Sequence, residues 1–90
     1  MANDTRRSAA ALKYTEKKGA PTLVAKGEGF IAEKILATAR EHGIPIHHDP
    51  ALVGALTRLD LGEQIPTELY SAVATVIAFI YRLQKQQGAR

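Results

Sequence analysis

The tetrapeptide Lys26-Gly27-Glu28-Gly29 lies between a short apolar run and a helical pattern, where phosphate-binding loops are found. Nucleotide loops of known type need a third glycine or a Gly-Lys followed by Ser or Thr, and this sequence has neither there. Glu28 would also bring a negative charge to the phosphate. The tetrapeptide therefore indicates a tight structural turn, and we expect no bound nucleotide or other cofactor.

A second polar cluster, His47-His48-Asp49, follows another short apolar run. Successive residues of a strand point to opposite faces, so His47 and His48 should diverge. His42 stands at the predicted end of a helix and has no recognisable ligand spacing to the other two. We expect strand-end and helix-capping roles for these residues, and no metal site.

Nucleophile chemistry is equally poorly supported. Ser8 and Ser71 are the only serines, and neither lies in a nucleophile-elbow context. The chain has no cysteine, which excludes a disulfide framework and a thiolate nucleophile. The sequence therefore predicts no catalytic residue and a protein that is not an enzyme.

Size and charge restrict the remaining classes. Ninety residues allow one modest domain, and no stretch is apolar enough to cross a bilayer or to act as a secretory signal. The net charge is +3, but the basic residues are scattered and interleaved with acids. This pattern favours a solvated surface over a nucleic-acid stripe. A small basic nucleic-acid-binding module remains the alternative, and its binding would weaken steeply with salt.

The elements that hold these residues follow from periodicity. A strand over Ser8–Tyr14 and a turn ending at Pro21 lead into a strand at Leu23. A helix should begin near Glu28 and stop at Gly43, and the apolar run 44–47 should form another strand. Strand, helix and strand in this order predict a parallel βαβ unit. The fold class is therefore α/β, with a small mixed sheet of about three strands flanked by helices.

Two further helices are predicted. Asp49 and Pro50 are a typical N-cap and first helical residue, and this helix should end near Arg58 or Leu59. A connector, anchored by Leu61 and Ile65, leads to a long C-terminal helix from Pro66 or Thr67 to about Gln86. We expect residues 8–86 to form the domain, with a flexible lead at 1–7 and a flexible tail at 87–90.

The long helix carries two apolar stripes at helical spacing. The first consists of Leu69, Val73, Val76, Ile80 and Leu83, and the second of Tyr70, Ala74, Ile77 and Tyr81. Together they exceed the apolar face that one contact needs. Either both stripes are core, or part of the helix is free to bind a partner.

Several segments in register resemble the cytoplasmic C-terminal domain of the FlhB/YscU family, the export-apparatus proteins of flagellar and other type III secretion systems. The segments are A-L-K-Y at 11–14, A-P-x-L-V-A-K-G at 20–27, G-I-P-I at 43–46, P-A-L-V-G-A-L at 50–56 and the run 62–81. The resemblance covers nearly the whole chain, from about Ala9 to Leu83. It implies a compact α/β domain that acts in protein export.

One motif departs from the family. Family members carry N-P-T-H, a self-cleaving turn, just before the A-L-K-Y strand, and cleavage there needs the asparagine side chain. This chain has Asp4-Thr5-Arg6-Arg7 at the matching positions. The departure predicts a non-catalytic, stand-alone homologue that does not cleave itself.

The resemblance also implies partners and a site. The partners would be export-apparatus proteins, either an FlhB-like membrane domain or the export gate, and early export substrates. The site would be a shallow apolar patch of Ala20, Pro21, Ala74 and Ile77, and an unpaired sheet edge could accept a strand. We expect no nucleic acid, and a cytoplasmic location with membrane association only through the apparatus.

Overall fold

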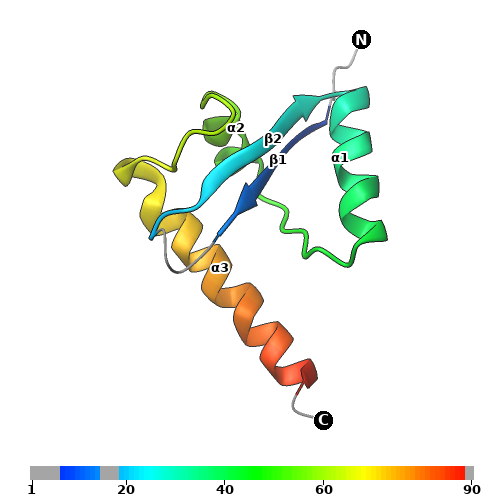
Figure 1. Cartoon of the computed structure of the whole chain (residues 1–90), viewed down its shortest axis with the longest axis vertical. Helices are drawn as coiled ribbons and strands as arrows, with labels where there is room; N and C mark the ends of the chain where they lie inside the picture. Colours follow the sequence, from blue (N-terminus) through cyan, green and yellow to red (C-terminus); the bar gives the residue numbers. More distant parts are fainter. Residues whose placement is uncertain (1–6, 15–18, 89–90) are drawn as a thin grey trace.

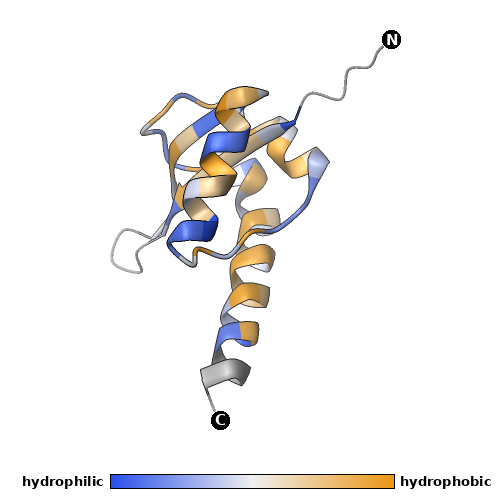
Figure 2. Ribbon diagram, turned by 90° about the vertical axis from the view of Figure 1, so that its right-hand side faces the viewer, coloured by the Kyte–Doolittle hydropathy of each residue, from blue (hydrophilic) through white to orange (hydrophobic). Residues whose placement is uncertain are grey.

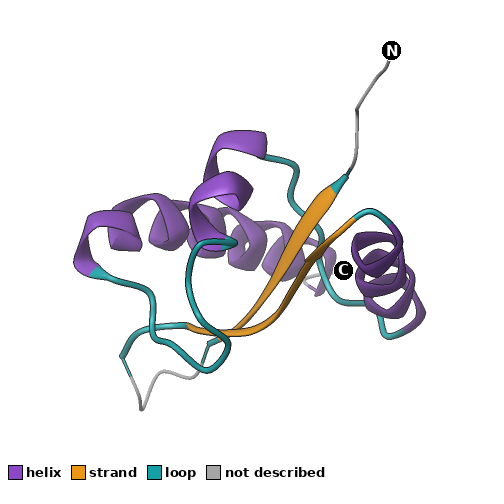
Figure 3. Ribbon diagram, turned by 90° about the horizontal axis from the view of Figure 1, so that it is seen from above, coloured by secondary structure: helices purple, strands orange, loops and turns teal. Residues whose placement is uncertain are grey.

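The structure, a computed structural model, describes residues 7–14 and 19–88. Within them lie two strands, β1 (Ser8–Lys13) and β2 (Thr22–Glu28), and three helices, α1 (Phe30–Glu41), α2 (Pro50–Leu56) and α3 (Thr67–Gly88). The strands form an antiparallel pair between helices, with α1 on one side and α2 and α3 on the other (Figures 1 and 3). The α/β class, the flanking helices and the long C-terminal helix agree with the prediction.

The core lies where the hairpin meets α2 and α3. Leu56, Ile65 and Val73 form a buried cluster, against which Ala10 and Leu12 of β1 pack. Because strand side chains alternate between faces, the neighbouring Ala9 belongs to the opposite face, beside α1, and it is also buried. The small alanines of β1 therefore let helices approach the sheet from both sides.

The predicted parallel βαβ unit is not found in the described residues. Residues 44–49 have no regular secondary structure, and the sheet contains only the antiparallel pair β1–β2. Pro45 removes one backbone donor from this segment, and no described strand lies against it. The sheet is thus two-stranded and antiparallel, where we expected about three strands in a mixed sheet.

The connector before α3 forms backbone hydrogen bonds with the start of β2, on the edge of β2 that does not face β1. Leu23 donates to Glu63 O at 2.9 Å, and Gly62 donates to Leu23 O at 2.7 Å. An isolated antiparallel bridge joins Thr22 to Gln64. Ile65 anchors this connector in the core as predicted, whereas Leu61 is 61% exposed and does not.

The helix ends follow local rules. Gly43 adopts a positive φ of 68°, and the N–H groups of Gly43 and Ile44 bond to Arg40 O and Ala39 O, which is a Schellman motif. Asp49 caps α2, because its carboxylate accepts from the Leu52 N–H at 3.1 Å. Both predicted boundaries are confirmed. The start of α1 is two residues later than predicted, because Glu28 belongs to β2 and Gly29 makes the turn.

The ends of the chain are only partly described. The predicted lead lies outside the described residues apart from Arg7, and so do three of the four residues that replace the self-cleaving motif. α3 continues to Gly88, two residues past its predicted end. Its second half projects from the body, and hydrophobic residues recur along it (Figure 2). No helix among the described residues has the length and apolar character that a membrane span requires.

Candidate protein-docking site

A hollow of about 190 Å³ lies between α3 and the loop end of the β1–β2 hairpin, where residues 14–21 join the two strands. Its lining residues are Tyr14, Pro21, Tyr70, Ala74, Ile77, Ala78 and Tyr81. Three of the four residues predicted for the site, Pro21, Ala74 and Ile77, therefore lie together. The fourth, Ala20, is half-buried next to Pro21 but does not line the hollow.

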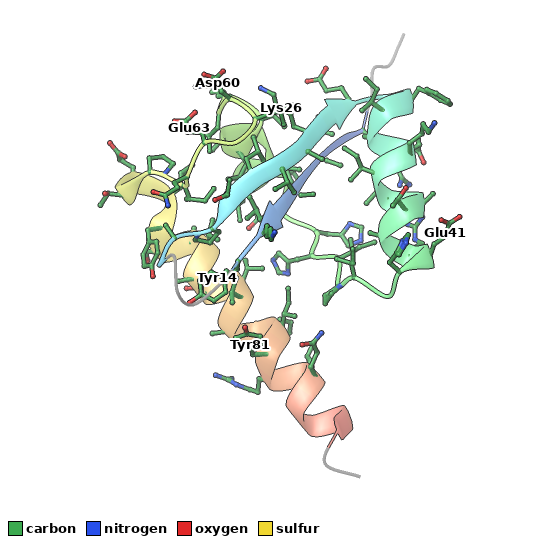
Figure 4. All side chains as sticks on the ribbon, viewed as in Figure 1. Tyr14, Lys26, Glu41, Asp60, Glu63 and Tyr81 are labelled. Atoms are coloured by element: carbon green, nitrogen blue, oxygen red, sulfur yellow. The ribbon has the colours of Figure 1, made fainter. Side chains whose placement is uncertain are left out.

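Two elements build this hollow, which we call the α3 hollow. On α3, Tyr70, Ala74 and Ala78 are four residues apart and share one face with Ile77 and Tyr81. On the hairpin, the last register pair is Lys13 with Thr22, so the residues just beyond it, Tyr14 and Pro21, meet at the same end. Figure 4 shows Tyr14 beside the middle of α3 and Tyr81 further toward its C-terminus.

Burial separates the floor of the α3 hollow from its rim. Pro21 is fully buried, and Ala74 and Ile77 are half-buried. Tyr70 and Tyr81 are 43% and 53% exposed, and Ala78 is exposed as well. Pro21 therefore offers little surface to a partner, although we placed it in the predicted patch. The Ile65 N–H donates to Pro21 O at 2.9 Å, so the connector before α3 lies against this turn.

Sequence reasoning missed part of this lining. Tyr70 and Tyr81 belong to the second apolar stripe and could have been included on that signal alone. Tyr14 and Ala78 carry no comparable signal, since their place depends on how the hairpin docks on α3. All seven lining residues are uncharged. The α3 hollow is therefore suited to an apolar side chain of a partner rather than to an ionic ligand.

The Lys26-Gly27 pair has structural roles. The Lys26 ammonium donates to Thr57 O at 3.1 Å and to Leu59 O at 2.6 Å, just past the end of α2 (Figure 4). A cation is favourable at a helix C-terminus. Gly27 lies within β2, where a Cβ would overlap the side chain of Ile31 on α1. Neither residue is arranged to hold a phosphate.

The histidines are dispersed. The ring Nδ1 of His42 lies 2.9 Å from Thr38 O at the end of α1. His47 packs edge-on against Phe79 of α3, with ring centroids 6.4 Å apart, and His48 is exposed. The described part of the chain contains no group of three His, Cys, Asp or Glu residues that could hold a metal ion.

A second hollow, of about 290 Å³, lies on the other side of α3. The segment after α1 and the projecting part of α3 line it with Gly43, Pro45, Ile46, His47, Phe79, Ile80, Leu83 and Gln84. The first apolar stripe is therefore core at Val73 and surface at Leu83, which is 44% exposed. The apolar face of α3 thus belongs to the core in the first half of the helix and is exposed in the second half.

Solved structures share this fold. The cytoplasmic domain of FlhB from Shewanella putrefaciens matches with a TM-score of 0.86 and 40% identity, over 92% of this chain and 66% of that chain. The PscU C-terminal domain matches with a TM-score of 0.77 and 27% identity, over 81% of this chain and 95% of that chain. The fold is therefore that of a small α/β domain of the same class as the FlhB cytoplasmic domain and the PscU C-terminal domain.

Sequence comparisons agree. The model described as the FlhB HrpN YscU SpaS Family matches residues 3–80, so the chain belongs to that family. The flagellar biosynthetic protein FlhB of Salmonella typhimurium is 46% identical over 77 residues. That alignment covers 83% of this chain but only 20% of the Salmonella protein. An uncharacterized Bacillus subtilis protein, YlqH, is 41% identical over 80 residues, which are 88% of this chain and 86% of YlqH.

Proposed function

We propose that this chain acts in type III protein export as a non-catalytic counterpart of the FlhB C-terminal domain, and that it influences which substrates are exported. The single observation that carries the proposal is the structural match to the FlhB cytoplasmic domain at 40% identity over 92% of this chain. It acts in the cytoplasm, at the inner face of the membrane through the export apparatus.

The α3 hollow is the surface that we assign to early export substrates. Its walls are apolar, and its rim is open to solvent at Tyr70, Ala78 and Tyr81. A single open hollow of this size buries far less area than a stable protein interface needs. Recognition there is weak and transient, which suits a chain that must be released for transport.

The outer edge of β1 is the surface that we assign to the apparatus itself. Among the described residues, β1 pairs with β2 along one edge only. An unpaired edge offers a row of N–H and C=O groups to a further strand. A strand from a membrane-bound FlhB-like protein would dock there by strand addition.

A secretion assay tests the export role. The host is a mutant of a flagellated bacterium whose FlhB lacks the matching C-terminal segment. In one arm of the experiment this chain is fused to the truncated FlhB in place of that segment, and in the other it is supplied as a free protein. We expect the fusion to restore secretion of rod and hook proteins into the medium, as measured by immunoblot. Secretion with the free protein would support strand addition. A fusion that accumulates normally in the membrane and secretes nothing would contradict the proposed function.

A further inference from the structure

One face of α3 is exposed from Glu68 to Arg82. The residues of this face alternate in spacings of four and three, and all of them are exposed: Glu68, Ala72, Thr75, Phe79 and Arg82. We call this row the outer stripe. Of its members only Phe79 also lines a hollow, the second one, so the outer stripe lies on a face of the helix between the two hollows. Alternate spacings of four and three are those by which two helices pack along each other in a coiled coil.

The outer stripe carries opposite charges at its two ends. Glu68 lies in the first turn of α3, and Arg82 follows fourteen residues later, about 21 Å along the helix axis. Neither side chain has an ion-pair or hydrogen-bond partner among the residues that the structure describes. Both charges are therefore available to groups outside the chain.

The middle of the outer stripe permits close contact with a second helix. Ala72 and Thr75 have small side chains, which let two helix backbones approach each other. The Thr75 hydroxyl donates to Ser71 O at 3.0 Å, so its proton is already bonded within α3 when the stripe is covered. Phe79 is 48% exposed and supplies a large apolar side chain, which fits against small residues on the opposite helix.

The charges select a second copy of α3 in one orientation. In a parallel pair Glu68 would face Glu68 and Arg82 would face Arg82, so both contacts would be repulsive. In an antiparallel pair with a two-fold axis at Thr75, each Glu68 lies beside the partner's Arg82, and each Phe79 lies against small residues of the partner's outer stripe. The outer stripe is thus complementary to itself in charge and in shape, and every contact occurs twice.

We propose that two copies of this chain associate through the outer stripes of their α3 helices, packed antiparallel. This inference goes beyond the proposed export role and does not depend on it, because the α3 hollow uses a different face of the helix. A single helix pair is smaller than the ~1,200–2,000 Å² of stable interfaces, so the dimer forms weakly, at micromolar to millimolar concentration.

Charge reversal tests the pairing, with sedimentation velocity of the full chain over a concentration series at low ionic strength. Glu68→Arg and Arg82→Glu each replace two attractive contacts by two repulsive ones, so each should raise the Kd of the dimer by about tenfold. Glu41→Arg and Arg40→Glu make the same charge changes at exposed positions of α1, across the sheet from α3 (Figure 3). These two controls should leave the Kd of the dimer unchanged.

A mixture of the two reversed chains gives the sharpest result. When the Glu68→Arg chain meets the Arg82→Glu chain, opposite charges face each other at both ends of the helix pair. Association should therefore return to near the wild-type level in the equimolar mixture, although each variant alone associates poorly. Recovery in the mixture would also show that both variants are folded.

A cysteine at the two-fold axis tests the position of the contact. The chain has no cysteine of its own, so Thr75→Cys introduces a single thiol. With an added oxidant it should form a disulfide-linked dimer, whereas Thr38→Cys, at an exposed position of α1, should not. Four results would each overturn the inference: a wild type that is monomeric at every concentration, charge reversals without effect, no recovery in the mixture, or equal cross-linking of the two cysteine variants.

Discussion

Gly27 shows how one residue links the sheet to α1. It pairs with Ala9 in the ladder, and a Cβ at this position would overlap Ile31. The overlap involves the Ile31 Cβ, 2.7 Å away, and not only the tip of a flexible side chain. A side chain at position 27 can therefore be accommodated only if α1 moves away from β2.

Gly27→Val should lower the free energy of unfolding by about 1–3 kcal/mol, the usual effect of forcing extra atoms into a packed contact. Chemical denaturation followed by circular dichroism measures it. Gly54→Ala is the matched control, since position 54 lies within α2 and faces open space. It should stabilise by up to ~1 kcal/mol through helix propensity. Saturable ATP binding by calorimetry, lost in Gly27→Val with the fold intact, would instead restore the phosphate-loop interpretation.

Single residues of the site were predictable to different degrees. Pro21, Ala74 and Ile77 followed from the resemblance, and the structure brings them together at the α3 hollow. Their burial could not be read from the sequence, because Pro21 is covered by the connector before α3, far away in the chain. The rim tyrosines provide better probes than Pro21, whose replacement by a charge would bury that charge in the core.

At the scale of elements, local signals predicted most boundaries. Gly43 ends α1, and Asp49 with Pro50 begins α2, because capping depends on residues only a few positions apart. The prediction of a strand at 44–47 was wrong because a strand depends on residues that are distant in the sequence. Strand formation requires a pairing partner, and no periodicity in one segment reveals whether another strand lies beside it.

The N-cap of α2 gives the test at this scale. Asp49→Ala removes the acceptor for the Leu52 N–H and should destabilise the domain by about 1 kcal/mol. For a domain of this size that corresponds to a fall in Tm of about 4–8 °C. Asp49→Ser keeps an acceptor oxygen and should retain most of the stability. Equal melting temperatures for wild type and Asp49→Ala would mean that the cap contributes nothing.

At the scale of the whole molecule, the two ends of α3 have different roles. Val73 and Leu69 pack into the core near the hairpin, while Phe79, Tyr81 and Leu83 remain exposed on the projecting half. A helix that exceeds its core contact in this way leaves apolar surface for partners. The sequence indicated this excess, but only the packing of the hairpin shows where on α3 the core contact ends.

The predicted lack of self-cleavage also belongs to the scale of the whole chain. Asp4-Thr5-Arg6-Arg7 stands where the family has its self-cleaving turn, and a carboxylate is a poorer nucleophile than the asparagine amide that cleavage there requires. Intact mass spectrometry after prolonged incubation at neutral and mildly alkaline pH should show one uncut species. A fragment produced by a break between residues 4 and 5 would contradict the prediction.

The central claim is that the α3 hollow docks export substrates, and a direct binding measurement tests it. Purified rod or hook protein is titrated by calorimetry into the wild-type chain, Ala78→Asp and Ala72→Asp, with thermal melts as the folding control. Both alanines are exposed on α3, so both variants should fold. We expect binding by the wild type and Ala72→Asp, and a loss of more than about 100-fold in Ala78→Asp, because a carboxylate would have to be desolvated in an apolar hollow. Equal binding by the two variants would show that substrates do not use the α3 hollow.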